Sequence, residues 1–169
     1  MSTDSWLAAA TQQLDGLKQL TDQIGLRFVE LPAHSMGVGF GVAFGGTEYA
    51  IVSVLSQNER HAFISAGVLQ DVSRAHRLDI LEFCNTIVQE GAGTPIFLHD
   101  AEAGWDLIAQ VTVPTQVLFD VPPYYGALLR GVASFAQQAR MRLAEAGITG
   151  QTYRWDNVDS ERLLSRSLV

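Results

Sequence analysis

Alternating glycines in the first third of the chain are the residues that most resemble a ligand-binding motif. The run Gly37-Val38-Gly39-Phe40-Gly41 has the glycine content of a phosphate-binding loop. A dinucleotide loop places its glycines at a strand-to-helix turn, where a helix N-terminus meets the phosphate. Here large and small residues alternate up to residue 44, and a second strand pattern follows. We therefore expect a strand whose small face lets another segment approach closely, and no nucleotide site.

The histidines do not form a recognisable metal or catalytic motif. They are spread along the chain, at His34, His61, His76 and His99. No two of them have the i, i+4 spacing of a metalloprotease helix. His99, Asp100 and Glu102 would place three ligands on one hairpin tip, without the second ligand cluster that a metal site normally takes from elsewhere in the chain. We expect no metal site.

The remaining reactive side chains are one thiol and a few carboxylates. Cys84 is the only cysteine, which excludes an intrachain disulfide and a cysteine-based zinc cage. It lies in the middle of an apolar helical pattern, so we expect a buried structural cysteine. Asp100, Glu102 and Asp106 are close enough to suggest an acid/base pair, but carboxylates this close in a hairpin usually form its polar rim. The sequence therefore predicts no catalytic residue and no cofactor.

Length and composition indicate one globular domain. The chain has 169 residues and is 47% apolar, which excludes general disorder. Only 17% of the residues are charged, which favours a surface partly covered by a partner. The net charge is −7, and no run of basic residues occurs. This balance argues against binding to nucleic acid or to an anionic membrane.

Targeting signals are the next feature that the sequence addresses. The first six residues contain no positive charge and no continuous apolar stretch follows them, so they do not resemble a signal peptide. No window approaches the roughly 18 uninterrupted apolar residues of a membrane-spanning helix. We expect a cytoplasmic protein.

Apolar periodicity predicts three helices and six strands. A first helix ends at Gly25, a second covers about residues 73–90, and a third begins at Pro122 and ends at Gly147. The predicted strands are 26–31, 37–44, 47–56, 60–69, 94–99 and 105–113. Their connections are too short for parallel crossovers.

The fold class that follows is α+β. We expect an antiparallel sheet flanked by helices, in the order α-β-β-β-β-α-β-β-α. Residues 1–147 form a single domain in this interpretation, and residues 148–169 form a C-terminal tail in which 159–168 have the length of a short helix. Trp155 in this tail either folds back onto the domain or contacts a partner.

The second predicted helix has an apolar arc that is too wide for one sheet contact. At about 100° per residue, its apolar side chains cover more than half of the circumference. The excess suggests burial on two sides, and the second side is available to a partner subunit. We therefore expect a homodimer. The residues expected at the partner or dimer surface are Ile80, Phe83, Ile87, Ile108 and Trp155.

Several segments resemble YbjN-like proteins, which are bacterial proteins related in fold to type III secretion chaperones. The segment 40–44, the turn Gly45-Gly46 and the segment 49–54 look like the central hairpin of that family. Residues 66–69 followed by 78–85 are similar to its strand-then-helix step. Residues 94–100 with 105–113 resemble its second hairpin. The similarity covers about residues 20–145.

The resemblance implies a chaperone-like α+β domain, frequently a homodimer, without an enzymatic centre. Related secretion chaperones hold partly unfolded polypeptide segments. The family often has a second asparagine shortly after the first in the second helix, whereas Val88 stands at that spacing after Asn85. Any role of an asparagine pair is therefore not transferred to this chain.

Two functions remain open at this point. The first is a non-enzymatic protein-binding module, chaperone-like or regulatory, which acts as a homodimer and takes another protein or an unfolded polypeptide segment as partner. The alternative is a small-molecule-binding or enzymatic domain with a pocket between sheet and helices, lined by the glycine-alternating strand. A flat or grooved apolar surface would favour the first.

Overall fold

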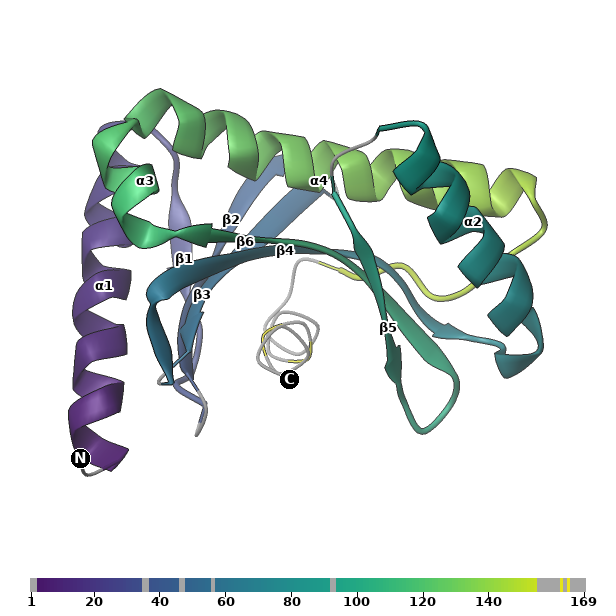
Figure 1. The fold of residues 1–169 in the computed structure, drawn as a ribbon, viewed down its shortest axis with the longest axis horizontal. Helices are drawn as coiled ribbons and strands as arrows, with labels where there is room; N and C mark the ends of the chain where they lie inside the picture. The colour runs from purple at the N-terminus through teal and green to yellow at the C-terminus, as the bar shows by residue number, and fades with distance from the viewer. Residues whose placement is uncertain are drawn as a thin grey trace.

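A computed structural model describes residues 3–34, 37–45, 48–55, 57–91, 94–154, 162 and 164 of the chain. In this part of the chain, six strands form one antiparallel sheet, and helices pack on one of its faces (Figure 1). The elements are α1 (Thr3–Gln23), β1 (Phe28–Glu30), β2 (Gly37–Gly45), β3 (Glu48–Leu55), β4 (Asn58–Val72), the 3₁₀ turn η1 (Arg74–His76), α2 (Arg77–Gln89), β5 (Ile96–Asp100), β6 (Trp105–Pro114), α3 (Thr115–Asp120) and α4 (Pro122–Glu145).

The strand order across the sheet is β1-β2-β3-β4-β6-β5. Strands β1 to β4 follow one another as a meander, and the hairpin β5–β6 joins the other side of β4 through β6. The predicted α+β class and element order are confirmed. The structure adds the short helix α3, which directly follows β6. Sequence periodicity cannot detect a helix of six residues, because that length gives fewer than two turns.

The helix ends follow from local residue types. Gly25 has φ 76°, a left-handed conformation that glycine adopts without steric cost, and the next amide, Leu26 N, donates to Thr21 O over 3.0 Å. This closes α1 and turns the chain into β1. At the other end of the domain, Pro122 and Pro123 occupy the first turn of α4, where proline leaves no helical hydrogen bond unmade.

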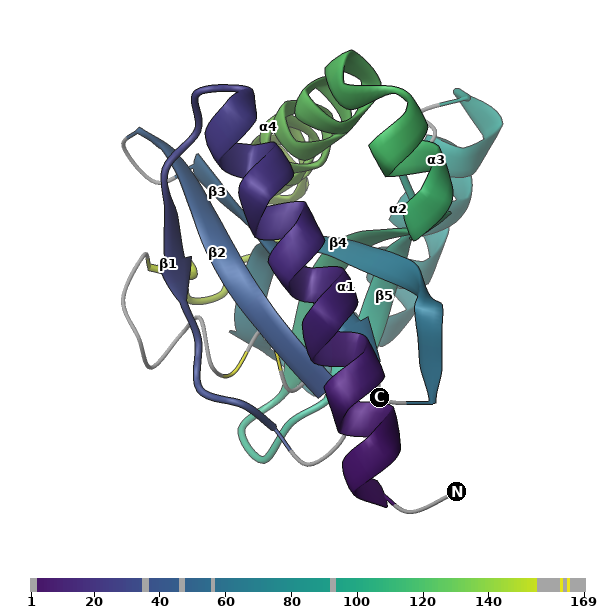
Figure 2. The same ribbon diagram turned by 90° about the vertical axis from the view of Figure 1, so that its left-hand side faces the viewer.

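The helices share one hydrophobic core with the first face of the sheet. Figures 1 and 2 show α4 crossing the sheet and α1 lying diagonally beside β2, with α2 at the opposite end. Large residues of β2 such as Phe40 and Val42 point into this core, as their alternation predicts. They meet Leu14 and Leu17 of α1 and Leu129 of α4, all at most 3% exposed. This burial is the main stabilising contribution to the fold.

The second face of the sheet is covered by residues from the C-terminal part of the chain. Tyr153 and Leu164 form a smaller apolar cluster there with Tyr49, Ile51 and Ile108. The C-terminal residues contact the sheet beyond the point where β3 stops pairing with β4. The last register pair of these two strands before that point is Ile51–Ser65. Beyond it, the backbones of Gln70 and Gln151 exchange two hydrogen bonds of 2.8 Å.

No helix among the described residues is long and apolar enough to cross a membrane.

Candidate functional site

The outer side of α2 is an apolar surface that no described element covers. Leu78 is 76% exposed, Val88 is 70% exposed and Leu81 is 40% exposed. At about 100° per residue, these three side chains lie within a quarter of the helix circumference. Figure 1 shows α2 at one end of the molecule, with this helix open to its surroundings. We call these three residues the α2 surface.

The buried side of α2 contains residues that we expected at the partner surface. Ile80 and Ile87 are 0% and 2% exposed and pack within the chain itself. Ile108 is also fully buried, on the second face of the sheet. The structure corrects this assignment: these three residues are core, and the exposed apolar side chains are those of the α2 surface. The helical wheel gave the width of the apolar arc but could not say which part of it faces the sheet. Trp155 lies outside the described residues.

Phe83 and Cys84 lie between the two sides of α2 and are half-buried. The guanidinium of Arg142, from α4, lies 5.5 Å from the centre of the Phe83 ring and forms an ion pair of 2.8 Å with Glu90. The hydrogen bond from Arg142 lowers the pKa of the Glu90 carboxyl. Burial raises the pKa of the Cys84 thiol, which disfavours the nucleophilic thiolate. Cys84 is therefore not arranged for covalent chemistry.

The alternating glycines lie inside β2, with β3 directly paired to it, so no helix N-terminus follows them. The run therefore does not form the strand-to-helix turn of a dinucleotide loop. A Cβ atom added to Gly39 would lie 2.7 Å from Leu164 Cδ1, which is closer than carbon atoms can approach. The small face of this strand thus receives a side chain of the C-terminal segment, as a close approach predicts.

A second glycine holds the aromatic anchor of that segment. A Cβ atom on Gly67 in β4 would lie 2.2 Å from the ring of Tyr153, which is fully buried. The carbonyl oxygens of Gly67 and Val68 accept hydrogen bonds from Arg140 of α4, at 3.3 and 3.0 Å. β3 leaves one edge of β4 unpaired. Backbone groups on this edge form hydrogen bonds with the side chain of Arg140 from α4 and with the backbone of Gln151.

Two carboxylates on the second face bind one arginine. Arg162 donates to both oxygens of Asp106, from Nε to Oδ2 over 2.9 Å and from Nη2 to Oδ1 over 2.6 Å, and also to Asp71 Oδ1 over 2.8 Å. These hydrogen bonds, first the one to Asp71, raise the pKa of Arg162. Asp106 is fully buried, and breaking a buried ion pair by removing one partner costs about 3–5 kcal/mol. We call Asp71 and Asp106 the acidic pair.

The backbone at Asp71 is bent to form this pair. Asp71 has φ 55°, and it is the only described residue other than glycine in the left-handed region. The bend lies in an irregular stretch of the pairing between β4 and β6, between Leu69 and Val72. It turns the Asp71 amide toward Asp106 Oδ1, 3.2 Å away, while the Asp71 carboxylate reaches Arg162. Strained backbone of this kind often marks a functional site.

The predicted metal and acid/base candidates do not meet in one site. Within the described ranges, no group of three histidine, cysteine or acidic side chains could hold a metal ion. His61 Nδ1 lies 2.7 Å from Asn58 Oδ1, and His76 pairs with Asp79 on the helix surface. Asp100 forms an ion pair with Arg74, whereas Asp106 forms one with Arg162, so the two carboxylates do not share a site.

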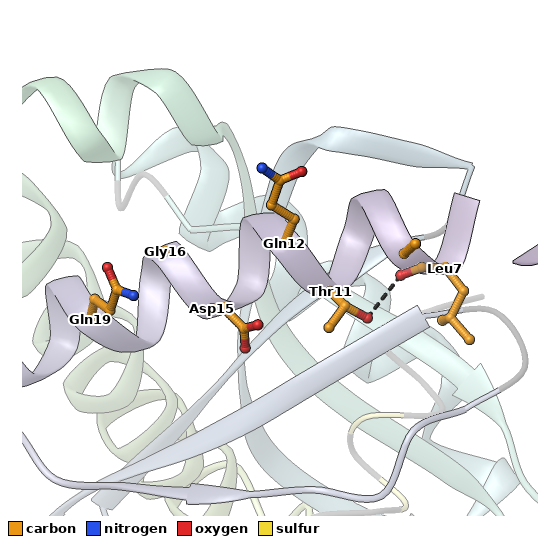
Figure 3. Close-up of a pocket in the computed structure, with 7 residues that line it drawn as sticks. Leu7, Thr11, Gln12, Asp15, Gly16 and Gln19 are labelled. Carbon is orange, nitrogen blue, oxygen red and sulfur yellow. Dashed lines mark hydrogen bonds between the residues drawn. The ribbon is translucent and has the colours of Figure 1, made fainter. Parts of the chain in front are cut away.

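Hollows on the surface are the places where a small ligand could bind. One of about 690 Å³ runs along α1 and is lined by Leu7, Ala8, Thr11, Gln12, Asp15, Gly16 and Gln19 (Figure 3). In Figure 3 its polar side chains point away from the helix and do not converge on one point. Another of about 580 Å³ lies between α4, at Tyr124, Leu128 and Phe135, and the segment that leads from α2 to β5, at Gly91 and Thr94. Neither contains a reactive pair.

The fold is similar to that of proteins with solved structures. The crystal structure of YbjN from E. coli, described as a candidate transcription regulator, superimposes with a TM-score of 0.59 and 14% identity, over 80% of this chain and 93% of that chain. The chain has the YbjN fold. An uncharacterized protein from Methanothermobacter thermautotrophicus, with a TM-score of 0.56 and 15% identity, covers 81% of this chain and 99% of its own.

The predicted YbjN-like resemblance is therefore confirmed at the level of the fold. No protein-family model matches the sequence, and no curated protein matches it. About one fifth of the chain lies outside each superposition on the YbjN fold. At this level of identity, the comparison concerns architecture, and the function has to be argued from the surfaces described above.

Sequence reasoning did not find the acidic pair. Asp106 stood on the polar face of a predicted strand, and Arg162 belonged to a tail without a clear period. The two residues are 56 positions apart. One signal was present: an aspartate between Trp105 and Leu107, at the start of a β-rich segment, is unusual unless a cation reaches it. Nothing in the sequence indicated which cation that would be.

Proposed function

We propose that this protein is a non-enzymatic protein-binding module, chaperone-like or regulatory, which acts as a homodimer in the cytoplasm. The α2 surface carries the proposal, because one short helix has apolar side chains both in the core and on its exposed side. Leu78 and Val88 lie at its two ends, 76% and 70% exposed. Exposed apolar side chains that are grouped in this way mark contact surfaces more often than those that are scattered singly.

The composition supports the same interpretation. Only 17% of the residues are charged, and the net charge of −7 disfavours direct contact with nucleic acid. The solved structure of YbjN is described as that of a candidate transcription regulator. If the present chain has a regulatory role, its charge favours one that is exerted through protein contacts.

Partner capture with matched variants tests this proposal. The full-length protein is immobilised, and proteins of the native host that bind to it are identified by mass spectrometry. We expect the double variant Leu78→Asp, Val88→Asp to lose at least about 90% of a specific partner, because two charges would enter an apolar contact. The partner is then purified and its affinity for both proteins is measured.

The control is Val117→Asp, which changes a residue of α3 that is 41% exposed. The helix α3 lies at the other end of the molecule from α2 in Figure 1. This variant adds a charge at an exposed apolar position without touching the α2 surface, so it should keep the partner. Equal affinity of the purified partner for the wild type and the double variant would contradict the role of the α2 surface. A catalysed reaction by the purified protein would contradict the non-enzymatic assignment.

A further inference from the structure

We propose that the second face of the sheet, around Asp71 and Asp106, is a binding site for an arginine-bearing segment of another protein. In this structure the C-terminal segment of the chain itself occupies that site. The site consists of four parts: the edge of β4 at Gln70, which pairs with Gln151, the aromatic site over Gly67, the apolar site over Gly39, and the acidic pair. Each part contacts the C-terminal segment by a different kind of interaction.

The acidic pair determines the chemistry of any occupant. Asp106 is fully buried and accepts both nitrogen donors of one guanidinium, while Asp71 accepts from the same Nη2 atom. A planar guanidinium can make this bidentate contact, whereas a lysine ammonium cannot. A segment that replaces the C-terminal one must therefore bring an arginine to the same position.

Further polar groups lie around the present occupant. A hollow of about 370 Å³ next to Arg162 is lined by Asp71 and by a further carboxylate, that of Glu102. Arg162 forms ion pairs with Asp71 and Asp106, and Glu102 lines the same hollow. In addition, Ser53 Oγ is buried and has no hydrogen-bond partner among the described residues. Ser53 lies beside Gly39, where Leu164 packs. A segment that brings a polar group to Ser53 would satisfy this buried hydroxyl.

The charge balance favours another protein over a second copy of this chain. Residues 149–169 contain three arginines and three acidic residues, so the segment is neutral, and the whole chain has a net charge of −7. A second copy would offer the same neutral segment together with an acidic body. A basic segment of a different protein would instead be attracted to the acidic body of this chain and to the acidic pair.

This site is separate from the α2 surface. It lies on the second face of the sheet, whereas α2 packs with the core on the first face. The present inference therefore adds a second protein-binding surface to the proposed function, and each surface is tested by a different variant. Peptide binding measured with purified protein does not depend on whether a host partner is captured through α2.

The experiment compares full-length chains whose own segment is weakened, with synthetic peptides as probes. Arg162→Gln removes the guanidinium from the acidic pair, and Leu164→Ala removes the apolar contact at Gly39 without touching the carboxylates. The probe is a 21-residue peptide with the sequence of residues 149–169 in which Asp156, Asp159 and Glu161 are replaced by their amides, which makes it more basic. Binding is measured by fluorescence anisotropy at two salt concentrations.

We expect the basic peptide to bind both opened chains at least about tenfold more tightly than the wild type, because the tethered segment of the wild type competes at high effective concentration. The same peptide carrying Arg162→Gln should lose at least about tenfold in affinity. Adding Asp71→Asn to the Leu164→Ala chain should cause a similar loss, since asparagine tolerates the left-handed backbone but carries no charge.

Three results would overturn the proposal. The first is peptide binding that does not change when its arginine or Asp71 is replaced. The second is no binding to either opened chain, while circular dichroism and thermal melting show that both chains remain folded. The third is a mass of the opened chains that is doubled relative to the wild type under the same conditions and that the peptide does not reverse, because the face would then be occupied by a second copy.

Discussion

Gly67 is the residue on which the packing of the C-terminal segment depends most directly. A Cβ atom there would lie 2.2 Å from the Tyr153 ring, which is buried on all sides and cannot move away freely. We expect Gly67→Ala to lower the free energy of unfolding by about 1–3 kcal/mol through overpacking. The measurement is equilibrium unfolding in urea, together with protease cleavage after Arg154, which should become faster as the segment detaches.

Gly131 is the matched control for this substitution. It lies in α4 and has nothing within 4 Å of an added Cβ atom. Alanine favours a helix over glycine, so Gly131→Ala should raise the free energy of unfolding by about 0.5–1 kcal/mol. If Gly67→Ala were equally stable or more stable than the wild type, the contact between Gly67 and Tyr153 would not be a close one.

Tyr125 gives the chain an alkaline pH dependence. Its hydroxyl is buried between α4 and α1 and lies 2.9 Å from Thr21 Oγ1. Burial raises the pKa of the phenol above its ordinary value, because the folded state favours the neutral form. The unfolded chain releases this proton near pH 10, whereas the folded chain keeps it. The stabilising contribution is therefore complete below about pH 10 and is lost as the pH rises above it.

Tyr125→Phe should remove this part of the pH dependence. Between pH 9.5 and 11, we expect the wild type to lose about 1 kcal/mol more stability than the variant, since only the wild type has the buried phenol. Urea unfolding of both proteins across this range measures the difference, and the other titrating groups cancel in the comparison. Parallel stability curves would show that the phenol of Tyr125 is accessible to solvent in the folded state.

At the scale of elements, α2 combines a core side and an exposed side in adjacent residues. Ile87 is 2% exposed and Val88 is 70% exposed. We expect Ile87→Asp to lower the free energy of unfolding by at least about 3 kcal/mol, because an unpaired carboxylate would enter the core and the methyl contacts would be lost. Val88→Asp should cost less than about 1 kcal/mol, mainly from a negative charge in the last turn of the helix.

Thermal melting and urea unfolding of the two variants test this prediction under identical conditions. Both changes introduce the same carboxylate, one residue apart, so a difference in stability comes from the direction of the side chain. Similar stabilities for the two variants would mean that α2 does not pack as described. Loss of self-association in Val88→Asp without loss of stability would assign the α2 surface to the dimer contact.

At the scale of the whole molecule, we predict a homodimer in solution. A specific dimer buries on the order of 800 Å² per subunit, and the α2 surface has the apolar centre that such a contact needs. Sedimentation velocity at micromolar concentration should give a species of twice the 18.4 kDa chain mass. The double variant Leu78→Asp, Val88→Asp should sediment as a monomer, whereas Val117→Asp should remain a dimer. A wild-type protein that sediments only as a monomer would reject the prediction.

The element order and the first core could be predicted from the sequence, because both depend on local periodicity. The alternation of Val38, Phe40 and Val42 with glycine identified a strand with one large face, and the structure confirms that this face points into the core. Gly25 and Pro122 marked helix ends through backbone preferences that do not depend on the rest of the molecule. Such properties act over a few residues, so a single sequence contains them.

The two surfaces were decided by the tertiary structure. The helical wheel of α2 showed an excess of apolar residues, but only packing determined that Ile80 and Ile87 face the core and that Leu78 and Val88 remain exposed. The acidic pair with Arg162 depends on a strand, a bent strand end and a distant C-terminal segment coming together. Contacts between residues 56 or 91 positions apart leave no periodic signal in the chain, because they arise only when the sheet has formed and its second face is available.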